Sequence, residues 1–191
     1  EIPLNQSNDF LKMLFTLMLI PALDKAGALF ETGKLFLPQL IQCAQAAQAS
    51  FGVIRETMAS QGNTSVSKGK IILATVKGDI HDIGKNIVKV LLENYGFTVI
   101  DLGRDVAPER IVKTAIEMDV PLVGLSALMT TTLQSMEQTI ALLKQKKPDC
   151  VVMVGGAVLT EEYAQKIGAD YYSKDAKQSV DIAQHIFGEN E

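Results

Sequence analysis

The sequence predicts an α/β protein in which a parallel β-sheet follows a small helical unit. After Lys70, five short apolar runs alternate with five helical segments, and crossovers of this length join parallel strands that are covered on both faces. Before Ser60, long apolar-rich segments show helical spacing instead. We therefore expect a helical cap domain at 1–60, a linker at 61–70 and an α/β domain at 71–191.

The composition of the 191 residues excludes several functional classes. Apolar residues make up 47% and charged residues 21%, which allows a packed core and excludes bulk disorder. With 18 Lys and Arg against 22 Asp and Glu, the net charge of −4 argues against nucleic acid as a partner, because nucleic-acid binding needs clustered cations. No apolar run is long enough to cross a bilayer, so we expect no membrane partner.

The two cysteines and the first residue indicate the setting of the chain. Cys43 and Cys150 cannot form a disulfide framework, so we expect a cytoplasmic protein. Both lie in apolar stretches and are expected to fill the core rather than to react. The chain begins with Glu1 instead of Met, and we expect it to be a fragment of a longer protein.

Three helices are expected in the first 60 residues. Pro21, Gly33 and Pro38 interrupt the apolar pattern. The helices that they separate are predicted at 9–20, 22–30 and 37–58. The segment SQGNTSVSKGK that follows consists of small and polar residues, as is typical of a linker.

The second half predicts five strand–helix units. The strands are expected at 71–76, 98–102, 122–128, 151–154 and 171–172. The helices that follow them are expected at 84–95, 108–118, 132–146, 161–167 and 176–187. Pro108 suits a first helical turn, and Gly96 suits the end of a helix. We expect a flavodoxin-like (Rossmann-like) sheet with the strand order 2-1-3-4-5.

Three loops at the carboxyl ends of strands carry the residues suited to chemistry. They follow strands one, three and four and span 77–84, 126–132 and 155–157. In the expected strand order, strands one and three flank the point at which the order reverses. Ligands of open parallel sheets bind at such points, so we expect the three loops to form one binding crevice.

His81 is the candidate metal ligand in this crevice. Asp79, two residues before it, can accept the N–H of the other ring nitrogen and fix the tautomer. Gly84 and the pair Gly155–Gly156 remove side chains where a bulky ligand must approach the backbone. Polar contacts are offered by the hydroxyls of Ser126, Thr130 and Thr132. A lone Asp-x-His pair more often belongs to a structural histidine, whereas the three loops together are specific.

The first loop differs from a phosphate-binding P-loop. Gly78–Lys85 has the spacing Gly-x-x-x-x-Gly-Lys, but Asn86 stands where a P-loop has Ser or Thr. The charges of Asp82 and Lys85 are expected to be solvated at the start of a helix.

Two segments resemble a known family. GDIHDIGKNIV at Gly78–Val88 is similar to the cobalamin-binding fingerprint of corrinoid methyl carriers and methionine synthases, and the Ser126-x-Leu128 and Gly155–Gly156 elements fit the same family. LFETGKLFLPQLIQCA at Leu29–Ala44 resembles the helical cap that precedes the cobalamin domain of methionine synthase.

The resemblance implies methylcobalamin as the cofactor and His81 as the lower ligand of its cobalt. It implies a relay in which Asp79 bonds His81 and a hydroxyl, here Thr132, so that His81, Asp79 and Thr132 form the catalytic set. Phe30 and Leu37 would cover the methyl-bearing face, and the segment around Asp175 would close over the nucleotide tail. The full cofactor-binding set comprises Gly78, Asp79, Ile80, His81, Asp82, Gly84, Ser126, Leu128, Thr130, Gly155, Gly156, Phe30, Leu37 and Asp175.

The resemblance also implies a function as the cobalamin module of a methyltransferase. Our main expectation is a methionine synthase module that carries a methyl group from methyltetrahydrofolate to homocysteine, with the folate and homocysteine domains as partners. The first alternative is a free-standing corrinoid protein of a methanol, methylamine or aryl-ether methyltransferase system. A second is a cobalamin-sensing regulatory domain, although such sensors typically use a cap tryptophan and this sequence has none. A third is an adenosylcobalamin mutase, which shares the histidine loop but not the cap.

Overall fold

The computed structural model describes residues 18, 20–60 and 67–188, which divide into two compact units. One unit extends to Lys68 and includes the short segment Glu93–Gly96, and the other comprises Gly69–Leu92 and the chain from Phe97 onward. Most of the helix predicted at 9–20 and most of the predicted linker lie outside the described residues.

The helical unit contains two helices, α2 (Ile20–Glu31) and α3 (Leu37–Ser60), whose residues contact one another. Pro21 lies in the first turn of α2, where a missing N–H costs no helical hydrogen bond. Gly33 takes a positive φ of 70° in the turn between the two helices. The small interior of this unit includes the buried residues Ala26, Leu40 and Ala47.

The α/β unit contains the predicted parallel sheet. Its five strands lie in the order β2-β1-β3-β4-β5, and every neighbouring pair is parallel. The flavodoxin-like fold class is therefore confirmed. The strands are β1 (Lys70–Thr75), β2 (Thr98–Asp101), β3 (Leu122–Ser126), β4 (Val151–Gly155) and β5 (Tyr171–Ser173).

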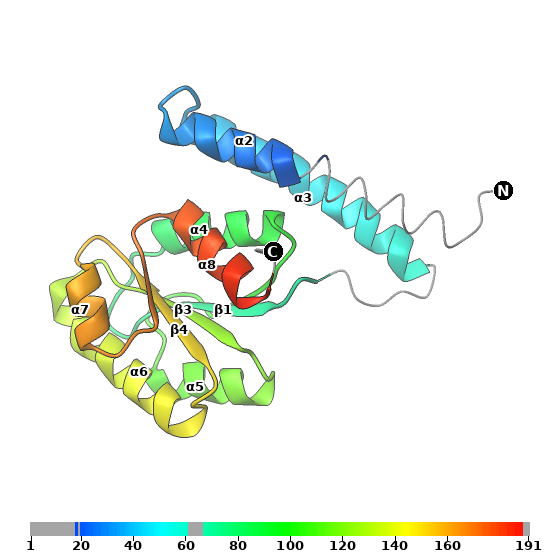
Figure 1. Ribbon diagram of the computed structural model, residues 1–191. Helices are drawn as coiled ribbons and strands as arrows, with labels where there is room; N and C mark the ends of the chain where they lie inside the picture. The colour runs from blue at the N-terminus through cyan, green and yellow to red at the C-terminus, as the bar shows by residue number, and fades with distance from the viewer. Residues whose placement is uncertain (1–17, 19, 61–66, 189–191) are drawn as a thin grey trace. The chain divides into compact units, whose positions relative to one another are not determined.

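Helices cover both faces of this sheet (Figure 1). One face carries α4 (Ile83–Asn94) and α8 (Ala176–Ile186), and the other carries α5 (Pro108–Glu117) and α6 (Leu133–Lys146). The short helix α7 (Glu161–Lys166) contacts β5. Because helices cover both faces, the central strands are buried on both sides, as the run Ile71–Thr75 shows.

Local signals fix the ends of several elements. Pro108 begins α5, and Gly96 takes a φ of 91° after α4. Thr160 and Asp175 are the N-caps of α7 and α8, and their side chains accept hydrogen bonds from backbone N–H groups of the first turn. The expected core position of Cys150 is confirmed, since this residue is buried in the hydrophobic core directly before β4, whereas Cys43 is half-buried in α3.

The third strand and the following helix depart from the prediction. Strand β3 ends at Ser126 instead of Leu128, and α6 begins at Leu133 after a single 3₁₀ turn at Thr130–Thr132. The chain leaves the sheet early because the backbone N–H groups of Leu128 and Met129 turn toward the side chain of Asp79. Apolar character alone could not reveal that turn.

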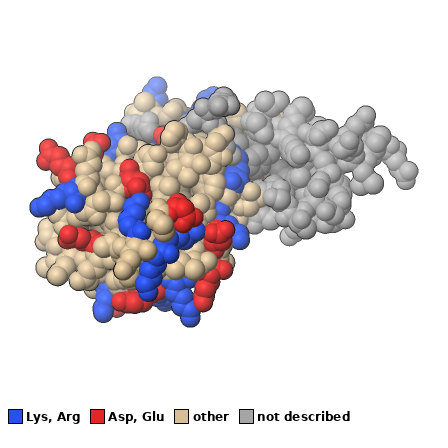
Figure 2. Space-filling model, turned by 60° about the horizontal axis from the view of Figure 1, so that its bottom comes forward, with Lys and Arg blue, Asp and Glu red and all other residues tan. Residues whose placement is uncertain are grey.

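The face at the bottom of Figure 1, seen in Figure 2, carries intermixed charges of both signs. Ion pairs on the α5–α6 side of the sheet join Lys113 to Glu117 and Lys147 to both Asp119 and Asp149. Within the residues that the structure describes, no helix is both long enough and apolar enough to cross a membrane.

Candidate functional site

The loop after β1 forms the centre of the site. Val76, directly after β1, forms an isolated bridge to Val106, and its N–H donates to the carbonyl of Ser126. Gly78 then takes a φ of 87°, a conformation that side chains rarely adopt. This turn points the next side chain, Asp79, into the protein, where it is fully buried.

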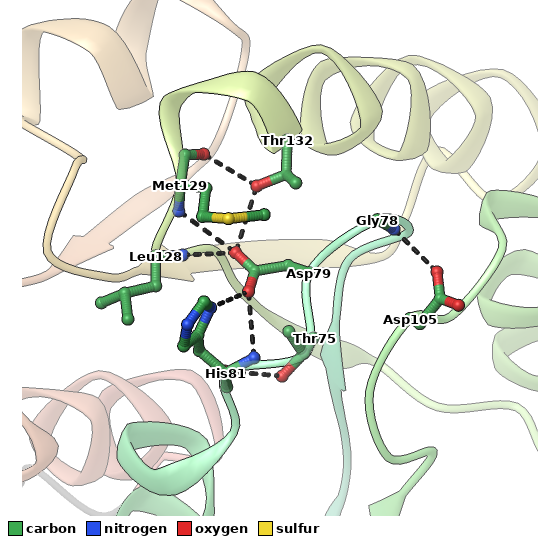
Figure 3. A network of polar contacts seen from close by, with 8 residues as sticks. All are labelled: Thr75, Gly78, Asp79, His81, Asp105, Leu128, Met129 and Thr132. Carbon is green, nitrogen blue, oxygen red and sulfur yellow. Dashed lines mark hydrogen bonds and ion pairs between the residues drawn. The ribbon is translucent and has the colours of Figure 1, made fainter.

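Asp79 connects the first loop to the loop after β3 (Figure 3). Its Oδ1 accepts from the backbone N–H of His81 at 3.0 Å and from His81 Nδ1 at 2.8 Å. Its Oδ2 accepts from Leu128 N at 2.6 Å and from Met129 N at 3.2 Å. Thr132 Oγ1 also lies 3.1 Å from Oδ2 and 2.8 Å from the Met129 carbonyl, so its one proton is shared between two acceptors.

These donors keep Asp79 ionised despite its burial. Desolvation alone would raise the pKa of the carboxyl group, but the hydrogen bonds from His81, Leu128 and Met129 outweigh it and lower the pKa to about 2. A buried carboxylate with this many donors is a fixed negative charge at neutral pH.

Asp79 also determines which nitrogen of His81 is available. A carboxylate can only accept, so the ring must carry its proton on Nδ1 when it is neutral. The lone pair then lies on Nε2. The hydrogen bond to Asp79 fixes the orientation of the ring. Because 46% of the His81 side chain is exposed, Nε2 is also accessible.

Large apolar side chains are exposed around His81. Ile80 is 60% exposed, Ile83 is 77% exposed and Leu128 is 42% exposed, and all three come from the loops that Asp79 joins. Exposing so much apolar surface is unfavourable in water and is typical of a surface that a ligand or partner covers.

The three glycines predicted to contact the ligand have different structural surroundings. A Cβ on Gly84 would meet nothing within 4 Å, so this position leaves open space beside the histidine loop, as expected for ligand approach. A Cβ on Gly156 would lie 1.8 Å from the Ala127 carbonyl oxygen, and at Gly155 it would lie 3.0 Å from that of Ser173. The backbone of the protein itself therefore already requires glycine at position 156, and contact of the glycine pair with a cofactor stays a prediction.

The structure gives the other predicted residues different positions. Ser126 ends β3, Thr130 is exposed, and Asp82 is half-buried just before α4. Asp175 is engaged as the N-cap of α8, where Oδ1 accepts from Gln178 N at 2.8 Å. Phe30 and Leu37 belong to the helical unit, at the end of α2 and the start of α3. Cofactor contacts of all these residues stay predictions.

Sequence reasoning missed three charged residues near the loop. Lys85 was expected to be solvated, but its side chain is 2% exposed and pairs with Asp101 at 2.6 Å. Asp105 accepts from Gly78 N at 2.7 Å. The partner of Lys85 lies on β2 and cannot be read from the spacing of residues in the sequence.

Comparison with known proteins places these features in a family. Residues 69–181, more than half of the chain, match the B12 binding domain, and residues 8–55 match a second B12 binding domain model. The chain is 42% identical over 170 residues to dimethylamine corrinoid protein 1 of Methanosarcina acetivorans, covering 88% of this chain and 79% of that protein. The chain belongs to the B12-binding corrinoid proteins.

Two solved structures show the same corrinoid-protein architecture. A cobalamin-binding protein from Desulfitobacterium hafniense DCB-2 superposes with a TM-score of 0.75 at 36% identity, over 93% of this chain and 83% of that one. The methanol:cobalamin methyltransferase complex from Methanosarcina barkeri gives a TM-score of 0.81 at 28% identity, over 92% of this chain and 67% of that one. The predicted cobalamin-binding family is confirmed. The expected place in methionine synthase, with folate and homocysteine domains, finds no support among these relatives, which favour the corrinoid-protein alternative instead.

The residues present fit a corrinoid cofactor. One accessible imidazole offers a single nitrogen ligand, as suits a metal whose equatorial positions are held by a macrocycle. The exposed apolar surface of Ile80, Ile83 and Leu128 suits the face of a large ring, and Gly84 leaves the backbone approachable. The site therefore conforms to the needs of a corrinoid-binding protein.

Proposed function

We propose that this chain carries a methyl group on cobalamin between the proteins of a methyltransferase system. The observation that carries the proposal is the exposed His81 ring, whose Nδ1 is bonded to a buried carboxylate and whose Nε2 is available. When bound, cobalamin supplies a cobalt centre that takes up a methyl group and gives it up again.

The residues of the chain have distinct roles in this proposal. His81 Nε2 would be the nitrogen ligand of cobalt when cobalamin is bound, and Asp79 fixes the ring and its tautomer. The Asp79 carboxylate would hold Nδ1 whether or not Nε2 is bound to the metal. Thr132 supports the other carboxylate oxygen. The cofactor contacts are assigned to Gly78, Ile80, Asp82, Gly84, Ser126, Leu128, Thr130, Gly155, Gly156 and Asp175.

The relatives suggest the class of partner. They are named as dimethylamine corrinoid proteins, and one solved relative is a complex with a methanol:cobalamin methyltransferase. We propose one methyltransferase that loads the methyl group from a small methylated compound, with methylated amines as the first class to test. A second methyltransferase removes the methyl group. We propose that the protein works in the cytoplasm and that its functional cofactor is methylcobalamin.

The helical unit is assigned a shielding role, with residues 1–60 as a cap domain joined by a linker to the α/β domain. Phe30 is 39% exposed, and an apolar side chain of this size can exclude water from a reactive cofactor. Phe30→Ala combined with Leu37→Ala should speed the aerobic photolysis of bound methylcobalamin. An unchanged photolysis rate would remove the shielding role while leaving the carrier function intact.

The binding mode is tested by spectroscopy of the two histidine variants. Wild-type protein with methylcobalamin should give the spectrum of nitrogen-coordinated cobalt, and His81→Gly should give the spectrum of a cofactor without a lower ligand. His185→Gly is the matched control, because His185 is the second histidine of the chain and lies exposed at the end of α8. Equal spectra for wild type and His81→Gly would refute the assignment.

The carrier role needs a second measurement. The purified chain, loaded with reduced cobalamin, is mixed with candidate methyltransferases and with methylated amines or methanol, and methylation of the cofactor is followed by its absorption. Methylation that needs both the donor and a methyltransferase supports the proposal. Binding of cobalamin without methylation by any of these pairs would point instead to the cobalamin-sensing alternative.

A further inference from the structure

A buried ion pair lies next to the histidine loop. Lys85 is in the first turn of α4, four residues after His81, and its side chain is 2% exposed. Its Nζ lies 2.6 Å from Asp101 Oδ1 and 2.8 Å from Asn86 Oδ1. A buried ammonium group is costly unless it is paired, so Lys85 holds the start of α4 against the end of β2.

Asp101 forms hydrogen bonds with more than one segment of the chain. It is the last residue of β2, and its Oδ1 also accepts from Gly103 N at 2.9 Å, while Lys89 Nζ lies 3.4 Å from Oδ2. Burial opposes ionisation of Asp101, but the hydrogen bonds from Lys85 and Gly103 and the nearby ammonium charges lower its pKa. The carboxylate therefore ties α4 to the loop between β2 and α5.

The loop between β2 and α5 also forms hydrogen bonds with the residues that precede His81. Thr75 N donates to the Gly103 carbonyl at 2.9 Å. Asp105 has a positive φ of 53°, which allows its N–H to donate to the Asp79 carbonyl at 2.9 Å while its Oδ1 accepts from Gly78 N at 2.7 Å. Hydrogen bonds from this loop thus fix the chain before His81, and the ion pair of Lys85 fixes it after His81.

We propose that Asp101 is a positioning residue for His81, acting through Lys85 on one side and through the Gly103–Asp105 segment on the other. The inference rests on the proposed function, in which His81 binds cobalt. It assigns to the β2 edge a role that no side chain of the relay provides: it fixes both ends of the loop on which the ligand stands.

The test compares two aspartates of similar chemistry. Asp101→Asn keeps the shape of the side chain and removes its charge. Asp170→Asn is the control, because Asp170 also accepts from a lysine and a backbone N–H, those of Lys144 and Val152, but lies at the amino end of β5. If the role of Asp101 is only general stability, the two variants should behave alike.

The first readout needs no cofactor. In the apo protein, hydrogen exchange of the peptide covering 78–83 should be at least about tenfold faster in Asp101→Asn than in wild type, and unchanged in Asp170→Asn. Wild-type exchange rates for this peptide in Asp101→Asn would overturn the proposal. This arm holds even if the chain proves to bind cobalamin without His81.

The second readout is the lower-ligand spectrum of bound methylcobalamin at a fixed pH. A loosened loop should weaken the His81–cobalt bond about tenfold in Asp101→Asn, which enlarges the fraction of bound cofactor without a nitrogen ligand. A wild-type protein that never shows nitrogen coordination refutes the proposed function, whereas a normal wild type with an unchanged Asp101→Asn spectrum refutes the positioning role alone.

Three further variants separate tethering from charge balance. Lys85→Met with Asp101→Asn removes both charges, so it should recover thermal stability relative to Asp101→Asn but not the slow exchange of the loop. Asp105→Gly, at an exposed position with positive φ that glycine accepts, should loosen the loop, and Asp105→Asn should retain its order because it keeps an acceptor for Gly78 N. Recovery of both properties in the double variant, or equal behaviour of the two Asp105 variants, would overturn the proposal.

Discussion

Asp79→Asn is the substitution that most directly tests the electrostatics of the site. The carboxylate accepts from His81 on one oxygen and from Leu128, Met129 and Thr132 on the other. An amide has only one acceptor oxygen, so in the variant an NH₂ group replaces one carboxylate oxygen and faces the N–H donors that bonded to it. The variant keeps the volume of the side chain and loses about half of its hydrogen bonds.

The magnitude follows from the pKa of Asp79. Its fall from 3.8 to about 2 is nearly two units and corresponds to roughly 2–3 kcal/mol of folding free energy. Since the folded pKa is the lower one, this contribution is fully present above the unfolded value near 3.8 and is lost as the pH falls through about 2. We expect Asp79→Asn to lower the free energy of unfolding by about that amount at pH 7, with the difference from wild type shrinking below pH 4.

The assay is urea unfolding of apo wild type and Asp79→Asn at pH 7, 5 and 3. Asp181→Asn is the control, because Asp181 is an exposed partner of Lys177 in α8, and removing its charge should cost less than about 1 kcal/mol. A free-energy difference between wild type and Asp79→Asn that stays the same from pH 7 to pH 3 would refute the reasoning, because the effect would then not come from the ionised carboxylate.

Three other predictions concern single positions. Gly156→Ala should cost more than about 4 kcal/mol or prevent folding, whereas Gly84→Ala should keep or raise the melting temperature of the apo protein and weaken cobalamin binding, measured by titration. Thr132→Val should lower the free energy of unfolding by about 1 kcal/mol, and Thr132→Ser should restore most of it because it keeps the hydroxyl near Asp79. Burial raises the pKa of Cys150 to about 11, so in a chain with Cys43→Ser the remaining thiol should react with a disulfide reagent at pH 8 only when urea unfolds the protein.

Local patterns in the sequence were sufficient for the fold of the α/β unit. Its strands are short apolar runs with helical crossovers between them, and Pro108 and Gly96 mark boundaries that the structure reproduces. The carboxyl-edge rule for parallel sheets predicts that the loops carrying Asp79, His81 and Thr132 meet, and the structure joins these residues by hydrogen bonds. The meeting of the loops follows from spacing and topology, whereas the pairing of Asp79 with Thr132 follows from the family resemblance.

The parts that the sequence could not predict depend on contacts between distant segments. Lys85 looks like a solvated helical charge until β2 brings Asp101 against it. The sequence also gives no sign that the Ala127 backbone lies where a side chain on Gly156 would be. The choice between methyltransferase systems also lies outside the motif, because the same histidine loop serves several of them, and only comparison with relatives favoured the corrinoid proteins.

The two-residue spacing of Asp79 and His81 explains how one loop can be both buried and accessible. Oδ1 of Asp79 accepts from the backbone and from the ring of the same residue, so His81 is oriented twice by one atom while its ring remains 46% exposed. The other oxygen is left for the loop after β3, where Leu128 contributes both an N–H to the carboxylate and an exposed apolar side chain to the surface. A change in the charge of Asp79 must therefore alter the His81 ring and that apolar surface together. In the proposed carrier this coupling allows the state of the lower ligand to be transmitted through a single buried carboxylate to the surface that the cofactor covers.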